Sequence, residues 1–253
     1  ISLTVFFGGI GPTVIFELVD RRKIKGAKPP LSYFSKLIIW GSIGLFIIPA
    51  FLFCALEWNH AFVHLTPFDK CMNALFHSTS LRTAGFNSVD LTQLTDSSWS
   101  ISLLLMMMGG SPLSTAGGIK VTTMLIALSA IFPLLRGRQK SILFNRAHPL
   151  TQSSKAVATL LFSLMIVFVV TLTLQASGEA LGIKTLLFEV ISALGTVGLS
   201  MGGTAALSQS GLWLVMFCMF LGRVGPPALL LSFSEGVTTT YEDTYIDEEV
   251  PLS

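Results

Sequence analysis

Long apolar stretches alternate with short polar connectors along this chain of 253 residues. Residues 37–56 and 156–176 each provide about the 20 apolar residues with which a helix crosses a lipid bilayer. Residues 211–233 form a third stretch of this length and hold a single charged side chain, Arg223. One buried core helix can imitate such a stretch, but several in one chain predict an all-α polytopic membrane protein.

Residues 109–120, "GGSPLSTAGGIK", interrupt what would otherwise be one more long apolar helix. A helix kink at Pro112 would need only one proline, whereas this segment also contains four glycines. A phosphate-binding loop is disfavoured, because "GGIK" lacks the Gly-Lys-Ser/Thr order and no strand precedes it. The composition therefore predicts a loop with non-helical backbone inside the membrane.

The charged residues indicate how the chain is oriented. They make up only 12% of the sequence, about half the usual share for a soluble domain. Residues 21–36 and 136–155 are rich in Lys and Arg, whereas the basic residues in 57–70 and 177–184 are Lys70 and Lys184 alone. Because positive charge accumulates in cytoplasmic loops, the first two connectors are predicted to face the cytoplasm. Charge of this kind sets topology, so we expect no nucleic-acid partner.

A sequence pattern recurs along the chain with a fixed spacing. The segments "FGGIGP", "MGGSPL" and "LGRVGP" align on their first glycine, which is Gly8, Gly109 or Gly222. A Thr-x-Gly triplet ends 24 residues before this glycine in the last two copies, at Gly85 and Gly198. Each triplet follows a helical segment too short to cross a bilayer. The predicted repeat is a membrane helix, a half-helix, a Thr-x-Gly loop and a second helix with a central glycine.

This repeat divides the chain into six predicted segments. They are the trailing helix of an incomplete repeat at 1–20, a cytoplasmic connector at 21–36, a complete pore repeat at 37–135, a second connector at 136–155, a second complete repeat at 156–236 and a C-terminal tail at 237–253. The Thr-x-Gly loop that should precede Gly8 would fall before residue 1. We therefore expect the sequence to begin inside a repeat, as the later part of a longer chain.

A Thr-x-Gly loop inside a membrane suits the binding of a monovalent cation. Non-helical backbone is tolerated there only where protein or a water-filled cavity surrounds it. A half-helix that ends at such a loop directs the negative end of its dipole toward the membrane centre. Glycine lets the backbone turn so that its carbonyl oxygens face a common axis, where a ring of them can replace the hydration shell of the ion. Two loops cannot close this ring, whereas four can.

Four segments, "SLRTAGFNSVDL", "MMGGSPLSTAGGIKVTT", "VISALGTVGLSMG" and "MFLGRVGP", resemble the signature segments of the Trk/Ktr/HKT superfamily of cation transporters. The sequence is most similar to the bacterial Ktr-type potassium-translocating subunit, over residues 1–236. The resemblance implies four unequal repeats around one pore, in a fold like that of potassium channels. This chain would contain the end of the second repeat and all of the third and fourth. Leu113 and Ala116 depart from the family pattern, which more often has glycine there.

The resemblance also implies which residues contact the ion. The two Thr-x-Gly loops become the third and fourth strands of a selectivity filter. The filter residues are Thr83, Ala84, Gly85 and Phe86 in one loop and Thr196, Val197, Gly198 and Leu199 in the other. The expected potassium ligands are Thr83, Ala84, Gly85, Thr196, Val197 and Gly198. The implied function is uptake of K⁺ across the bacterial inner membrane, with Na⁺ as a candidate co-ion.

The same resemblance makes the interrupted helix an intramembrane gate. Its residues are Gly109, Gly110, Ser111, Pro112, Ser114, Thr115, Gly117, Gly118 and Lys120, and Arg223 is expected to act with them. A cation at mid-membrane costs about 3 kcal/mol on insertion scales, so Arg223 should have a partner. We expect Arg223 to face the pore below the filter and to bind carbonyl groups of the loop. The alternative is a structural pair between helices, with Glu189 as the candidate partner.

Other polar residues are weaker candidates for function. Arg82 and Asp90 flank the third filter strand, where they either pair and brace the loop or simply lie in the outer vestibule. Glu57, His60 and His64 share one helical face, at a spacing that could bind zinc. Polar and aromatic residues are also common at a membrane interface, however, and this explanation is favoured.

The three cysteines, Cys54, Cys71 and Cys218, lie in or beside apolar stretches and have no CxxC spacing. We interpret them as small buried hydrophobic residues rather than as disulfides or metal ligands. An enzyme is not expected either. The apolar stretches hold no HExxH motif, no pair of membrane aspartates and no Ser/His pair of the kind an intramembrane protease needs.

The expected partners also come from the family resemblance. It implies a homodimer of membrane subunits, embedded in lipid, on a cytosolic nucleotide-binding ring of the regulatory RCK type. Missing N-terminal repeats of the same chain would complete the pore. The main alternative function is a sodium-conducting or sodium-coupled transporter of the same fold. A broken-helix secondary transporter is less favoured, because its repeats would have opposite topologies, and a partner-binding scaffold without transport is a further alternative.

Overall fold

The structure, a computed structural model, describes residues 2–23, 30–112, 114, 116–136, 140–143 and 146–225. The helices are α1 (Ser2–Ile10), α2 (Pro12–Lys23), α3 (Tyr33–Glu57), α4 (Pro67–Ser80), the 3₁₀ turn η1 (Leu91–Gln93), α5 (Asp96–Met107), α6 (Val121–Leu135), α7 (Leu150–Ala176), α8 (Ile183–Leu194), α9 (Gly203–Ala206) and α10 (Gln209–Val224). The strands are β1 (Lys140–Leu143) and β2 (Arg146–Pro149). The predicted tail and residues 226–236 lie outside the described residues.

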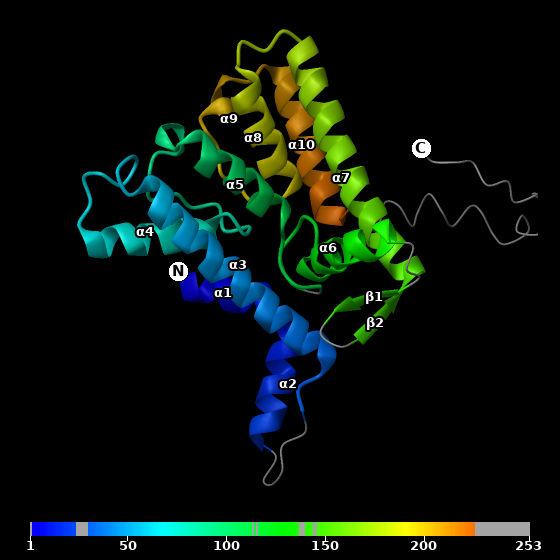
Figure 1. Ribbon diagram of the computed structural model, residues 1–253. Coiled ribbons are helices and arrows are strands. Elements are labelled where there is room, and N and C mark those ends of the chain that lie inside the picture. Colours follow the sequence, from blue (N-terminus) through cyan, green and yellow to red (C-terminus); the bar gives the residue numbers. More distant parts are fainter. Residues whose placement is uncertain are drawn as a thin grey trace, which may run out of the picture.

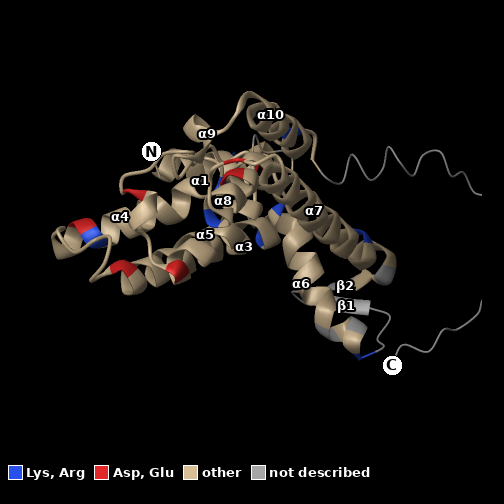
Figure 2. Ribbon diagram, turned by 90° about the horizontal axis from the view of Figure 1, so that it is seen from above, with Lys and Arg blue, Asp and Glu red and all other residues tan. Residues whose placement is uncertain are grey.

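Two of the described helices, α3 and α7, are long and apolar enough to cross a membrane, by length and composition. The predicted trailing helix at the start of the chain is instead broken: α1 and α2 meet at 90° and together could form one bent span. The break falls at Gly11, whose φ of 85° is in the left-handed region that glycine adopts without strain. Helices α6 and α10 include shorter apolar segments, Val121–Ile131 and Gln209–Val224. Figure 2 shows that charged residues are few along α3, α6, α7 and α10.

The half-helices α4 and α8 are too short to span a bilayer. With 14 and 12 residues, they reach about 21 and 18 Å at 1.5 Å per residue, against a hydrocarbon core of about 30 Å. Helix α4 starts at a sequence-encoded cap, because the Thr66 hydroxyl accepts a hydrogen bond from the Asp69 amide and Pro67 fits the first helical position. Helix α8 is buried from Phe188 to its end.

The helices pack as two similar units (Figure 1). In the first unit α3 packs on α4, and in the second α7 packs on α8, which also contacts α10. Two contacts between units are equivalent: α1 touches α4, and α5 touches α8. The trailing helix of each unit therefore lies against the half-helix of the next. The main hydrophobic core gathers around α8, where Phe188 and Leu186 are fully buried with Met106 of α5 and Leu174 of α7.

The second basic connector departs from the all-helical prediction. Strands β1 and β2 pair antiparallel in a hairpin, with Lys140 opposite Pro149 and Leu143 opposite Arg146. Pro149 ends the ladder, since proline has no amide hydrogen to donate, and it also stands at the N-cap of α7. Helix α7 accordingly begins at Leu150, six residues before the expected start at 156.

Candidate functional site

The two Thr-x-Gly loops have the same unusual backbone. Thr83 and Thr196 have φ angles of 64° and 52°, and Gly85 and Gly198 have φ angles of 73° and 88°. A β-branched residue such as threonine is rarely found at positive φ, because its side chain crowds the backbone there. Positive φ at every second residue thus recurs in two loops that lie more than a hundred residues apart. The shared sequence pattern corresponds to a shared local conformation.

A serine from the preceding half-helix fastens each loop. In the first loop the Ser80 hydroxyl donates to the carbonyl of Phe86 and accepts from its amide at 2.9 Å. In the second loop the Ser192 hydroxyl donates to the Leu199 carbonyl at 2.6 Å, and the Val197 amide donates to the Ser192 carbonyl at 2.9 Å. Sequence reasoning missed both serines. The available signal was a small hydroxyl residue near the end of each half-helix.

The backbones of the two loops meet directly. A Cβ atom added at Gly85 would lie 2.6 Å from the carbonyl oxygen of Val197 and 3.4 Å from the Cα atom of Gly198. Only glycine can occupy position 85 at this separation. The side chains of Val197 and Leu199 are buried on the protein side, each 3% exposed, whereas Phe86 is exposed. The close approach of Gly85 to Val197 and Gly198 thus involves main-chain atoms of both loops.

The segment between α5 and α6 is non-helical and doubles back on itself. The Gly109 amide donates to the Ile119 carbonyl at 2.8 Å, and the Ile119 amide donates to the Met107 carbonyl at 3.2 Å. Its two ends therefore lie side by side, which a kink at Pro112 alone would not produce. We call residues 108–120 the crossing loop. One of its predicted gate residues, Thr115, lies outside the described residues. Leu113, which departs from the family pattern, does so too.

The crossing loop touches three other parts of the protein. The Ser111 amide donates to the Gly9 carbonyl of α1 at 2.9 Å, and the Gly118 amide donates to the Gly222 carbonyl of α10 at 3.3 Å. The Gly117 amide donates to the Thr196 hydroxyl of the second Thr-x-Gly loop at 3.1 Å.

Close packing explains the glycine at position 117. A Cβ atom there would overlap the Thr196 side chain. The glycines were predicted to permit non-helical backbone, and at position 117 close packing is a second reason for glycine. The crossing loop lies immediately beside the base of the second Thr-x-Gly loop.

One cationic side chain belongs to the crossing loop and a second lies close to it. Lys120 donates from Nζ to the Ala116 carbonyl of the same loop at 2.5 Å. Arg223 occupies the last turn of α10, directly after Gly222, which receives the hydrogen bond from Gly118. The charges of Arg223 and Lys120 are close enough to interact. Both residues are at least partly exposed.

Glu189, the alternative partner of Arg223, is engaged elsewhere. Its carboxylate accepts hydrogen bonds from the Ser200 hydroxyl at 2.6 Å, the Met201 amide at 3.0 Å, the Gly203 amide at 3.1 Å and the Thr204 hydroxyl at 2.5 Å. These four donors match the acceptor capacity of a carboxylate. Glu189 therefore fixes the segment that follows the second Thr-x-Gly loop, and the geometry argues against the pair with Arg223.

Glu57 has a similar structural role, and the disfavoured alternative of a zinc group gains no support from the described residues. The fully buried Glu57 carboxylate accepts from the Thr95 amide at 3.0 Å and the Thr95 hydroxyl at 2.6 Å. It thereby ties the end of α3 to the start of α5. Over the part of the chain that is described, no group of three or more His, Cys, Asp or Glu residues could hold a metal ion. His60 and His64 thus belong to no metal site there.

Arg82 and Asp90 do not pair. Asp90 accepts from the Thr92 amide at 2.9 Å and from the Thr92 hydroxyl at 2.7 Å, so it caps η1. Arg82 is only 8% exposed, and within the described residues its Nε and Nη2 atoms have no hydrogen-bond partner. Its guanidinium group approaches Gly9 of α1.

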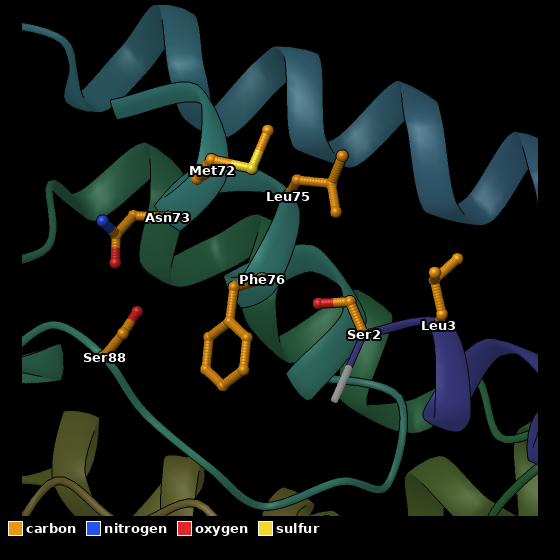
Figure 3. Close-up of a pocket in the computed structure, with 7 residues that line it drawn as sticks. All are labelled: Ser2, Leu3, Met72, Asn73, Leu75, Phe76 and Ser88. Atoms are coloured by element: carbon orange, nitrogen blue, oxygen red, sulfur yellow. The ribbon is translucent and has the colours of Figure 1, made fainter. Parts of the chain in front are cut away.

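An apolar groove lies between the start of α1 and helix α4. It has a volume of about 550 Å³ and is lined by Ser2 and Leu3 of α1, by residues of α4 and by Ser88. Figure 3 shows Phe76 of α4 between Ser2 and Ser88. The groove thus begins at the first described residue of the chain.

The sequence profile of the TrkH family, whose members are cation transport proteins, matches residues 1–238. The chain belongs to this family. It is 34% identical over 252 residues to Ktr system potassium uptake protein B of Bacillus subtilis (strain 168), which covers 99% of this chain and 55% of that protein. It is 38% identical over 232 residues to Ktr system potassium uptake protein D of the same strain, over 88% of this chain and 49% of that protein.

The crystal structure of the potassium transporter TrkH from Vibrio parahaemolyticus has the same fold. The two structures align with a TM-score of 0.73 at 18% sequence identity, over 92% of this chain and 50% of that one. The TrkH-family chain described here is thus a helical membrane protein of this fold, as predicted. It spans about half the length of the relatives that it matches.

Proposed function

We propose that this chain forms part of a pore that takes up K⁺ across the bacterial inner membrane. Residues 83–86 and 196–199 are two strands of its selectivity filter. The main observation behind this proposal is the junction of the two loops, where the main chain of Gly85 lies against the carbonyl oxygen of Val197. Two half-helices end there, and the relatives named as potassium uptake proteins support K⁺ as the transported ion.

Main-chain carbonyl groups provide the ion ligands in this pore. They belong to Thr83, Ala84, Gly85, Thr196, Val197 and Gly198. Helices α4 and α8 each direct a negative C-terminal dipole end toward these strands, which favours a cation. The serine hydrogen bonds keep the strands in shape, so the carbonyl groups need not reorganise when the ion sheds its water.

Two strands supply half of a ring, and preceding repeats of the same protein supply the other half. The relatives are long enough to contain these repeats, because this chain covers 49–55% of the two Bacillus subtilis proteins. The apolar groove beside α1 and α4 is a surface for them, since its lining is suited to packing against protein rather than to contact with water (Figure 3).

The crossing loop is the gate. Its hydrogen bond from Gly117 to Thr196 holds it beside the base of one filter strand, where it obstructs the path toward the cytoplasm. Arg223 stands next to the contact between Gly118 and Gly222, where its guanidinium group binds carbonyl groups of the loop and its charge repels resident cations. The gate residues are the nine named for the loop together with Arg223.

The chain works with further components. Its relatives are named as parts of Ktr systems, which supports a membrane subunit that acts with partners. More specifically, two copies of the membrane subunit form a homodimer that binds a cytosolic nucleotide-binding ring of RCK type. The basic connectors, including the hairpin of β1 and β2, are the cytoplasmic surfaces on which such a ring would bind.

The test is potassium uptake by cells that lack their own uptake systems and express the complete protein. Gly85→Ser and Gly198→Ser add a side chain at the filter junction, so the affinity for K⁺ should fall sharply while the protein still inserts. Gly182→Ser is the matched control, because a Cβ atom there meets nothing within 4 Å. Uptake of K⁺ by both filter variants at the wild-type affinity would refute the filter assignment, and preference for Na⁺ in the unmodified protein would refute K⁺ as the ion.

A further inference from the structure

Two of the cysteines are neighbours in space. The Sγ atoms of Cys54 on α3 and Cys71 on α4 lie 3.7 Å apart. The expectation that all three cysteines are buried is wrong: Cys71 is exposed and Cys54 is partly exposed, whereas Cys218 is buried. The Cys218 Sγ atom lies 3.8 Å from the Val190 carbonyl oxygen. Cys54 and Cys71 are therefore more exposed to solvent than Cys218, and their thiols lie close to each other.

Contacts on both sides of the cysteine pair hold α3 and α4 together. Toward the connector, Lys70 donates from Nζ to the Trp58 carbonyl at 2.6 Å. Toward the filter, the rings of Phe53 and His77 meet edge to face with centroids 4.6 Å apart, and Ser78 donates to a carbonyl of α3 at 3.0 Å. A disulfide has an S–S bond of about 2.05 Å, so the thiols need to approach by roughly 1.7 Å. Side-chain rotation can supply this movement while the helices stay packed.

The surroundings place the pair close to the outer face of the membrane. Cys71 directly follows Lys70, whose Nζ atom lies 4.7 Å from the ring centroid of Trp58. Tryptophan is typical of the membrane–water interface, where its ring lies at the level of the headgroups. The connector between α3 and α4 is poor in basic residues, which indicates the side opposite the cytoplasm. Disulfides persist in such compartments outside the cytoplasm.

We propose that Cys54 and Cys71 form a reversible dithiol–disulfide site that joins the outer ends of α3 and α4. The exposed Cys71 thiol loses its proton to solvent, and the thiolate attacks one sulfur of an external organic disulfide. The external S–S bond breaks, one external thiolate leaves, and a mixed disulfide remains on Cys71. Cys54 then gives up its proton and attacks the Cys71 sulfur, which expels the second external thiolate. Two protein thiols are oxidised to one disulfide, and one external disulfide is reduced to two thiols.

This site would link an external oxidant to the filter, because α4 carries the first Thr-x-Gly loop at its other end. The chemistry does not depend on which ion is transported. The proposal can therefore stand or fall separately from the proposed function.

The experiment treats the purified complete protein in lipid nanodiscs with excess 4,4′-dithiodipyridine, followed by alkylation and peptide mass spectrometry without reduction. The expected product is a peptide pair joined through Cys54 and Cys71 with no retained thiopyridyl group, and the cross-link should disappear after dithiothreitol. Cys54→Ser should instead keep a thiopyridyl group on Cys71. Cys218→Ser, the matched control, should form the cross-link as the unmodified protein does.

Three results would overturn the proposal. They are separate thiopyridyl adducts on Cys54 and Cys71, a lasting adduct on Cys71 beside an unreacted Cys54, and a failure of both thiols to react. Each is measured on the unmodified protein, so none depends on whether a variant folds.

Discussion

Replacing Gly117 by alanine tests the contact between the crossing loop and the filter. The Gly117 amide donates to the Thr196 hydroxyl at 3.1 Å, and an added Cβ atom would overlap the same side chain. The variant therefore cannot keep this contact without moving the loop, the Thr196 side chain or both. If the loop obstructs the pore, its displacement should favour the open state.

The size of the effect follows from two terms. Loss of one neutral hydrogen bond costs about 1 kcal/mol, and overpacking by one methyl group costs about 1–3 kcal/mol. Together they weaken the closed arrangement by about 2–4 kcal/mol, and 1.4 kcal/mol corresponds to about a factor of ten in a two-state equilibrium. The ratio of open to closed pores should therefore rise by roughly tenfold or more.

The assay is the flux of K⁺ into proteoliposomes at a fixed amount of inserted protein. Gly182→Ala is the control, because an added Cβ atom there has no neighbour within 4 Å. It should leave flux unchanged, whereas Gly117→Ala should raise it. Normal insertion of Gly117→Ala with lower flux would mean that the loop helps to conduct ions, and unchanged flux would mean that its contact with Thr196 does not hold the gate.

Two further predictions concern the filter hydroxyls and the cation below them. Ser192→Ala removes the donor to the buried Leu199 carbonyl, at a cost of about 1–3 kcal/mol; the KM for K⁺ uptake should rise at least several-fold, while Ser177→Ala at the end of α7 should leave it unchanged. A KM equal to wild type in Ser192→Ala would show that this strand keeps its shape unaided. Arg223→Ala should raise flux, and its effect should be non-additive with that of Gly117→Ala, because the two variants act on neighbouring attachments of the same loop, at Gly117 and at Gly118. Additive effects in the double variant would separate Arg223 from the loop.

The repeat and the site segments could be predicted because each is determined by residues that are close together in the sequence. The spacing between Gly85 and Gly109 recurs between Gly198 and Gly222, and it places a short helix, a loop and a glycine-containing helix in order. The interruption after Met107 is likewise visible as a change in composition. These features need no knowledge of which segments meet in space.

Pairings between distant segments could not be predicted in this way. The 3.7 Å approach of Cys54 to Cys71 depends on how α3 and α4 pack. The structural role of Glu57 was missed in the same way, because its partner Thr95 is 38 residues away. The hairpin of β1 and β2 was hidden within a connector whose charge indicated topology alone. Sequence periodicity reports which face of an element is apolar, but it does not identify the element that covers that face.

The central claim is that the junction of residues 83–86 and 196–199 binds the transported ion. The most direct measurement is a structure of the complete protein in Rb⁺, with anomalous scattering used to locate the ion. An anomalous peak between the main-chain carbonyl groups of the two Thr-x-Gly loops, which K⁺ displaces on exchange, is the predicted result. Ordered loops with no peak at this junction, and a peak elsewhere in the pore, would contradict it.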